Sequence, residues 1–240
     1  MRNYFTFAGY DSTEAGIYIT GSGVYNAPAR AYEEITIPGR NGLIIGNEKR
    51  LENLELVYPA YIYANFAENM RAARSFLLSQ VGYQRLEDTY YPDEFRLAYY
   101  AGGLDVEPTR QRDAGNFEIT FQCKPERYLK SGQETEEFNN RVAVAINPTL
   151  FDARPLIRVY GTGTASIEHN GQSIGSITVK TNPYEYIDID SDIMECFHGV
   201  DPCNRYVEMT DFEFPVFHPG ETDIYFNFSK MEITPRWWQL

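Results

Sequence analysis

Short runs of alternating apolar and polar residues, separated by turn-forming pairs, constrain this chain more than any other feature. Near the C-terminal end, the apolar residues Ile224, Phe226 and Phe228 each follow a polar residue or tyrosine, and a period of two is typical of a half-buried β-strand. The preceding Pro219-Gly220 pair fits a type II turn, because proline fixes φ at the second position and glycine accepts positive φ at the third. The pattern predicts strands joined by tight turns.

The same pattern recurs throughout residues 147–240, where no helical periodicity interrupts it. A second turn pair, Asn170-Gly171, lies between apolar runs and predicts a hairpin. The chain ends on Pro235-Arg236-Trp237-Trp238 and one more pair of residues, and we expect this apolar end to dock against the protein. Many short strands with frequent turns predict a β-sandwich or jelly roll.

The first sixty or so residues also predict strands and turns. Residues 35–37 and 43–45 are apolar runs on either side of Pro38-Gly39-Arg40-Asn41-Gly42. Because a type I′ turn needs positive φ at both central residues, Asn41-Gly42 predicts a hairpin with that turn. The hairpin is either a plain structural element or an arm that contacts a neighbouring subunit. In the second case Arg40, Asn41 and Gly42 are the candidate interface residues.

Residues 65–81 predict the one helix of the chain. Asn65 is a candidate N-cap, with Glu68 three residues later as in a capping box. One apolar stripe follows at helical spacing, and Gly82 suits the C-terminal end. We expect this stripe to pack on a sheet and not to bind a partner. Its members are Phe66, Met70, Ala73, Leu77 and Val81.

Strands return in residues 83–130, where Phe117, Ile119, Phe121 and Cys123 alternate on one face. This alternation predicts that Cys123 is a small core residue and not a nucleophile. The polar run from Lys130 has no periodic apolar face, which indicates a domain boundary. We expect an N-terminal domain over residues 1–137 and a C-terminal domain over residues 138–240, in a mainly β protein with one helix.

Composition narrows the classes of function. The net charge of −13 and pI of about 4.7 argue against attraction to nucleic-acid phosphates or anionic lipid. Three cysteines are an odd count for a disulfide framework. The first residues contain no apolar stretch of the signal-peptide kind, and no run is long enough to span a membrane. We therefore expect synthesis in a reducing cytosol.

Two clusters of possible metal ligands occur in the sequence, and neither matches the spacing of a known metal-binding motif. Asp188, Asp190 and Asp192 alternate as in a calcium loop, but that loop needs Gly at 193 and Glu at 199, where this chain has Ile193 and Gly199. We interpret the run as a solvated strand edge. The second cluster has an irregular spacing and lacks the fourth ligand of a structural zinc site. Its members are Cys196, His198 and Cys203.

Catalytic patterns are equally poor, so the sequence predicts no catalytic, metal or cofactor residues. Gly171-x-Ser173-x-Gly175 has the spacing of a nucleophile elbow, but it lies in the predicted Asn170-Gly171 hairpin and not on a turn from a strand into a helix. Gly161-x-Gly163 leads into a strand and not into a helix, unlike a phosphate-binding loop. The abundant carboxylates do not single out a glycosidase pair.

The ordered set of these features resembles the distal tail proteins of siphophages. The Pro38-to-Gly42 turn, the helix, the strand runs, Pro219-Gly220 and the Pro235-to-Trp238 end all occur in the order of that family, although Thr222 stands where the family pattern suggests Asn. The resemblance implies a β-sandwich-like, ring-forming N-terminal domain and a C-terminal galectin-like β-sandwich or jelly roll. It also implies a hexameric structural hub at the tip of a long tail, located in the virion, through which DNA passes without specific binding. Its partners would be the tail tube protein, the tail-tip protein and receptor-binding proteins.

Two other functions stay open from sequence. One is a carbohydrate-binding module that contacts the host cell wall, and the other is a cell-wall hydrolase. Galectins bind sugar with a His-x-Asn-x-Arg strand and a stacking Trp. Here His169-Asn170 falls in a predicted turn, and Trp237 and Trp238 lie at the C-terminal end. The galectin-like fold therefore does not by itself predict sugar binding.

Overall fold

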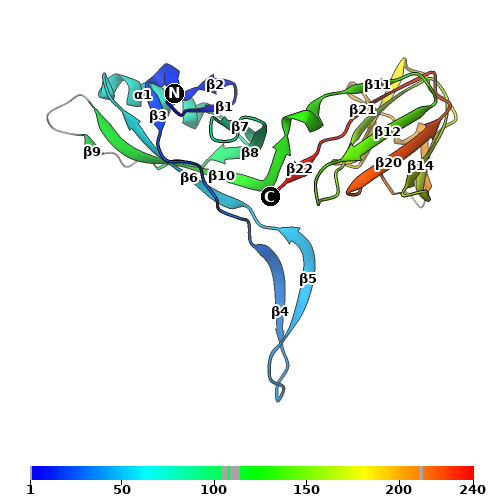
Figure 1. Cartoon of the computed structure of the whole chain (residues 1–240), viewed down its shortest axis with the longest axis horizontal. Coiled ribbons are helices and arrows are strands. Elements are labelled where there is room, and N and C mark those ends of the chain that lie inside the picture. Colours follow the sequence, from blue (N-terminus) through cyan, green and yellow to red (C-terminus); the bar gives the residue numbers. More distant parts are fainter. Residues whose placement is uncertain (1, 104–106, 109–113, 211–212) are drawn as a thin grey trace. The chain divides into compact units, whose positions relative to one another are not determined.

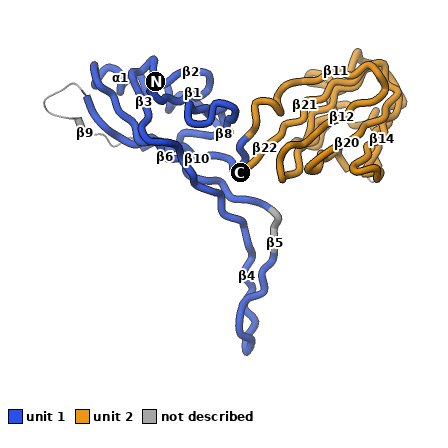
Figure 2. The backbone as a smooth tube through the Cα atoms, viewed as in Figure 1, with its two compact units in different colours: residues 1–127, 240 blue, residues 128–239 orange. Residues whose placement is uncertain are grey.

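The computed structural model of the 240-residue chain describes residues 2–103, 107–108, 114–210 and 213–240. The chain divides into two compact units, residues 1–127 with 240 and residues 128–239 (Figures 1 and 2). The described part is mainly β with one α-helix, which confirms the predicted class. None of its helices is long and apolar enough to cross a membrane.

The first unit is built on one curved antiparallel sheet. The strands follow the order β2-β1-β7-β8-β10-β6-β3, with β9 pairing β10. A separate pair, β4 and β5, completes the unit. The elements are β1 (Phe5–Phe7), β2 (Tyr10–Asp11), a 3-10 turn (Ser12–Ala15), β3 (Ile17–Ile19), β4 (Arg30–Thr36), β5 (Leu43–Leu51), β6 (Leu54–Ile62), α1 (Phe66–Ser79), β7 (Gln84–Asp88), β8 (Glu94–Tyr100), β9 (Glu107–Pro108) and β10 (Gly115–Leu129).

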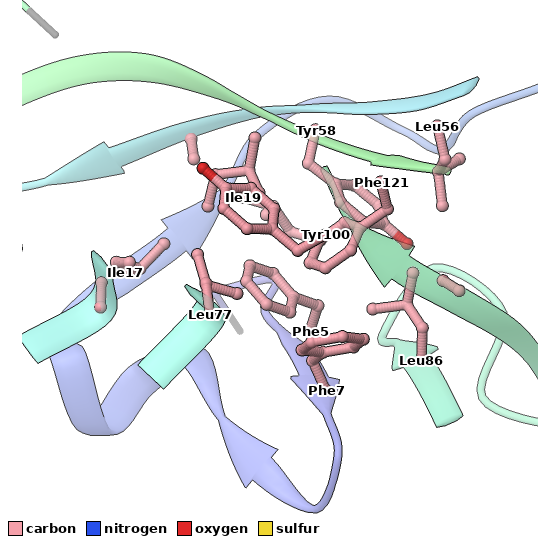
Figure 3. Packing of buried hydrophobic residues seen from close by; sticks show 14 of the residues in the cluster. Phe5, Phe7, Ile17, Ile19, Leu56, Tyr58, Leu77, Leu86, Tyr100 and Phe121 are labelled. Carbon is pink, nitrogen blue, oxygen red and sulfur yellow. The ribbon is translucent and has the colours of Figure 1, made fainter. Parts of the chain in front are cut away.

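Aromatic and aliphatic side chains together fill the core of this unit, as Figure 3 shows. Phe121 on β10 is fully buried and its ring lies 4.9 Å from that of Phe7 and 5.5 Å from that of Phe5. Tyr58 on β6 is fully buried as well and donates a hydrogen bond to Asp88. Cys123 is buried on the same face of β10, which confirms its predicted place in the core.

Helix α1 covers this core with part of the predicted stripe. Met70, Ala73 and Leu77 are buried, whereas Val81 lies beyond the helix and is 85% exposed. The predicted cap is wrong, because Asn65 adopts a left-handed backbone conformation and its side chain makes no capping hydrogen bond. Asn69 instead donates a side-chain hydrogen bond to the carbonyl of Ala64.

The second unit is a β-sandwich, as predicted for its part of the chain. One sheet has the order β11-β21-β13-β16-β17-β18 and the other β12-β20-β14-β15-β19, and their inner faces form a single core. The elements are a 3-10 turn (Lys130–Gln133), β11 (Glu136–Phe138), β12 (Val142–Asn147), β13 (Leu156–Tyr160), β14 (Gly163–His169), β15 (Gln172–Val179), β16 (Tyr186–Asp190), β17 (Glu195–His198), β18 (Asp201–Pro202), a 3-10 turn (Asn204–Tyr206), β19 (Val207–Met209), β20 (Gly220–Phe226), β21 (Lys230–Thr234) and β22 (Trp238–Gln239).

The polar run after Lys130 packs within the second unit. Strand β11 pairs β21, and Gly132 is buried against the backbone of Trp237, with its carbonyl accepting a hydrogen bond from the N–H of Arg236. The division between compact units falls between Arg127 and Tyr128. The domain boundary between residues 137 and 138 stays a prediction, which proteolysis tests.

Candidate assembly surface

Strands β4 and β5 form a two-stranded hairpin that extends away from the rest of the first unit (Figure 1). We call β4, β5 and the intervening residues 37–42 the arm. Thr36 pairs with Leu43, Ile35 with Ile44, and Glu34 with Ile45. Because directly paired residues of an antiparallel ladder share a face, both faces of the arm carry aliphatic side chains.

The arm leaves these apolar side chains in contact with solvent. Ala31 is the one buried residue of β4. An isolated two-stranded hairpin is marginally stable in water, and contiguous exposed apolar surface marks interaction sites. The arm is therefore the surface of the first unit best suited to bind another chain. Its large apolar residues are exposed as follows: Tyr32 53%, Ile35 44%, Leu43 50%, Ile44 44% and Ile45 60%.

The tip of the arm differs from the predicted turn. The N–H of Arg40 donates to the carbonyl of Ile37 over 3.2 Å, and Gly39 has φ of +78°. With proline at the second position and glycine at the third, this is the geometry of a type II turn. The predicted type I′ turn at Asn41-Gly42 is wrong, because Gly42 has positive φ but Asn41 does not. The candidate residues Arg40, Asn41 and Gly42 are all exposed at this tip.

A second surface region of the first unit combines exposed Arg2 and Tyr63 with half-buried tyrosines. The guanidinium of Arg2 lies 4.6 Å from the ring centre of Tyr63 and 5.1 Å from that of Tyr18, which stacks on Tyr61. We call these four residues the Arg2–tyrosine patch. Tyr18 lies on β3, an edge strand of the main sheet. Tyrosine and arginine are enriched in protein interfaces, and no local sequence pattern marks this patch.

The acidic run of the second unit is structural, and its interpretation as a solvated edge is wrong. Asp188 and Asp190 are 4% and 6% exposed on β16, which lies between β13 and β17. Arg158 donates two hydrogen bonds to Asp188, at 2.7 and 3.0 Å, and Arg236 donates two to Asp190, at 2.6 and 2.8 Å. Burial raises the pKa of Asp190, but the hydrogen bonds and charge of Arg236 outweigh it and lower the pKa below its ordinary value.

The cysteines and His198 belong to the packing of the sandwich. Cys196 and Cys203 are buried and unbridged, and the N–H of Cys203 donates to the carbonyl of Cys196. Burial raises the pKa of Cys196 to about 12, so its thiolate is scarce at neutral pH. His198 stacks on Tyr184. Within the described residues, no group of three or more His, Cys, Asp or Glu is placed to hold a metal ion.

Of the residues considered for sugar binding, the two tryptophans pack on the sandwich and His169-Asn170 lies at a hairpin turn. Asn170 and Gly171 form the two-residue turn of the β14–β15 hairpin with positive φ at both, which confirms that prediction. Trp237 is 6% exposed, so the C-terminal end docks as expected. Trp238 stacks on Phe151 and donates its indole N–H to the carbonyl of Asp152. The tryptophan rings are thus in use for packing.

A groove of about 320 Å³ on the second unit has Asp201 as the one carboxylate in its lining, which also includes Tyr184 and Arg205. A glycosidase needs two carboxyl groups that flank the scissile bond. This groove therefore does not supply that pair.

Comparison with known proteins relates the fold to two phage structures. The SPP1 Dit protein, described as a paradigm of the hub adsorption apparatus in phages that infect Gram-positive bacteria, matches with a TM-score of 0.77 and 14% identity over 100% of both chains. A chain of the phage p2 baseplate, in its activated conformation with Sr, matches with a TM-score of 0.52 and 13% identity over 97% of both chains. No protein-family model matches the sequence, and a search of curated proteins found no significant match. At this identity the likeness shows the fold.

Proposed function

We propose that this chain is a structural hub of the tip of a long phage tail, where it assembles into a closed ring. The exposed apolar arm carries the proposal, because a hairpin without a core of its own needs a partner chain. The fold supports it, since the SPP1 Dit protein, which this chain matches over its whole length, is described as a hub protein. The role is structural and not enzymatic, and it needs no cofactor.

A closed ring requires a heterologous contact between two different surfaces of each subunit. The arm is one of them, and we propose that the Arg2–tyrosine patch of the neighbouring subunit is the other. Glu33 and Glu34 are exposed on the arm among its aliphatic residues. Arg2 contacts tyrosine rings and forms no ion pair with a carboxylate among the described residues. Glu33 and Glu34 are therefore a local match for the charge of Arg2, on an arm that also exposes Arg30 and Arg40. Both surfaces carry apolar or aromatic area.

The proposed ring joins the tail tube protein to the tail-tip protein, with receptor-binding proteins attached at its outside. It contains six subunits if the family resemblance holds, and DNA passes through it. Each subunit carries a net charge of −13, so closure works against mutual repulsion. The same acidic charge suits a channel through which DNA slides without binding. Screening over roughly 8 Å at physiological salt reduces the repulsion, so the ring should be firmer at moderate than at very low salt.

Light scattering of the full chain across protein and salt concentration tests the proposal. We expect the double variant Ile35→Asp, Ile44→Asp to lose the ring while the melting temperature changes little. Ile174→Asp is the matched control, because Ile174 is a similarly exposed aliphatic residue, at 40%, in the other unit. A strict monomer at high concentration would contradict the ring. Binding of that monomer to a glycan array would instead favour the carbohydrate-binding function.

A charge exchange tests the receiving surface separately. Arg2→Glu alone and Glu34→Arg alone should each weaken the ring, and the two together should restore part of its stability if the residues meet across the contact. If the single variants weaken the ring and the double variant does not recover, the arm binds a different surface.

A further inference from the structure

We propose that the free edge of strand β12, in the second unit, binds an extended segment of another protein that carries aliphatic and basic side chains. The segment would add to the sheet as a further strand. This surface is independent of the arm and lies in the other compact unit. It follows from three features of β12: the direction of its backbone groups, the side chains above them and the charge beside them.

The backbone of β12 presents alternate residues to the side on which no described strand pairs with it. β12 is the last strand of its sheet and pairs only with β20 among the described strands. The N–H of Phe226 donates to the carbonyl of Arg141, so the residue pair 141/226 is hydrogen-bonded. In an antiparallel ladder such pairs alternate with pairs whose N–H and C=O point outward. The residues with outward backbone groups are therefore Val142, Val144 and Ile146.

The same three residues also present exposed aliphatic side chains. Val142 and Val144 are each 41% exposed and Ile146 is 63% exposed, whereas the alternate residues Ala143 and Ala145 are buried. Tyr225, which pairs with Val142, is 46% exposed. The edge thus offers hydrogen-bonding groups and an apolar strip on one line, which is what strand addition uses for affinity and specificity.

β12 lacks the devices that usually protect an edge. Its register with β20 runs without a bulge, and the strand contains neither proline nor any charged residue. Natural sheets protect exposed edges with such features or cover them with another element. An edge left without protection is therefore suited to a partner strand.

The charge next to the strip selects the partner. Asp223 and Glu221 on β20 pair with Val144 and Ile146, and Glu168 on β14 pairs with Asp223, so the three carboxylates share the outer face. No ion pair engages them within the part of the chain that the structure describes. Two copies of this edge would bring like charges together, whereas a segment with lysine or arginine would be attracted. The occupant is therefore a basic, aliphatic segment of a different protein.

Binding of a synthetic peptide to the full chain tests the proposal. The probe is a short, end-blocked, fluorescent peptide in which threonine alternates with valine or lysine, and fluorescence anisotropy measures its affinity. Val144→Pro should lower the affinity by about tenfold or more, because it removes an outward N–H and obstructs the edge. It should leave the melting temperature nearly unchanged, since that N–H does not bond to β20. Val144→Thr keeps the N–H and is the matched control.

Three results would overturn the proposal. They are equal binding to the wild type and Val144→Pro, equal binding of a peptide with glutamate in place of lysine, and no binding at millimolar peptide. Self-association of the wild type that disappears in Val144→Pro would make a second copy the occupant. Ring formation by the arm should be unaffected by Val144→Pro, so the proposed ring and this edge site can fail separately.

Discussion

Two hairpins of this protein contain the same turn pair and have opposite surroundings. In the β14–β15 hairpin, Asn170-Gly171 forms a two-residue turn and the inner side chains, such as Ile167 and Ile177, are buried in the sandwich. In the arm, Asn41-Gly42 is part of a longer tip, and Ile44 and Ile45 remain exposed.

The comparison separates what a turn sequence determines from what it does not. A turn pair brings two strands together, but burial depends on whether another apolar face lies opposite. The β14–β15 hairpin finds that face in its own chain. The arm does not find it among the described residues, so its aliphatic side chains are available for assembly. The two hairpins should therefore respond differently to the same kind of substitution.

Truncating one isoleucine in each hairpin should have unequal effects. Ile167→Ala should lower the free energy of unfolding by about 2 to 5 kcal/mol, because it leaves a cavity in the sandwich core. Ile45→Ala should change the stability of the isolated subunit by less than about 0.5 kcal/mol and weaken the ring. Chemical denaturation followed by circular dichroism measures both. Equal losses of subunit stability would show that the arm has a core of its own.

Breaking the buried ion pair of the second unit should destabilise the sandwich and spare the arm. Asp190→Asn should cost about 3 kcal/mol at neutral pH, because Arg236 loses its charged partner. The chain has two tryptophans, Trp237 and Trp238, and both lie in the second unit. Tryptophan fluorescence therefore reports the unfolding of this unit. The ring should persist in this variant under native conditions, and its loss would place assembly contacts outside the arm.

The same variant should change the response of the second unit to acid. The pKa of Asp190 is lowered in the folded state, so its stabilisation is complete above the unfolded value of about 3.9 and is lost as pH falls toward the folded value. Wild type should therefore lose stability below about pH 4 more steeply than Asp190→Asn. Parallel acid profiles in tryptophan fluorescence would assign the loss to other carboxyl groups.

Replacing the turn pairs by Ala-Ala should separate folding from assembly. At Asn170-Gly171 both residues have positive φ, so the change should cost the subunit about 2 kcal/mol. At Asn41-Gly42 only Gly42 has positive φ, and the cost to the fold should be about 1 kcal/mol. The second change should weaken the ring more than the fold. A ring as stable as that of the wild type would exclude the tip from the contact.

Assembly should have its smallest effect on limited trypsin digestion, where it should change only the rate of cleavage in the arm. Arg40 lies exposed at the tip of the arm, so trypsin should cut the isolated subunit there and the assembled ring more slowly.

Cleavage between Lys130 and Arg141 should give two stable fragments if the predicted domain boundary is correct. First cleavage inside α1 would show that this boundary is misplaced.

Local patterns predicted the elements that depend on neighbouring residues. The helix expected over residues 65–81 extends over Phe66–Ser79, and the alternation from Phe117 to Cys123 gave the buried face of β10 correctly. In both cases the periodicity of apolar residues within the segment indicates the type of element and which of its faces is apolar. The Asn170-Gly171 hairpin was predictable for the same reason.

Features that depend on distant residues were not predictable. Asp188 and Asp190 looked solvated because their neighbours in sequence supply no cation. Their partners are Arg158 on the adjacent strand β13 and Arg236, which follows β21. The tip of the arm contains two pairs with turn-forming preference, Pro38-Gly39 and Asn41-Gly42. The type II turn forms at Pro38-Gly39. The Arg2–tyrosine patch combines strands β3 and β6, whose pairing no local motif specifies.

If the proposed ring forms, the exposed arm also links the folding of the subunit to its concentration. A hairpin that is marginal alone and stable against a neighbour gains its order from the contact, so mass action on the subunits becomes part of the stability of the arm. The free-energy cost of ordering an arm opposes the first contacts between subunits. In a closed ring, every arm is held in order by a neighbouring subunit. A ring built this way should form above a threshold concentration with few partial rings, and its arms should lose order together when it is diluted.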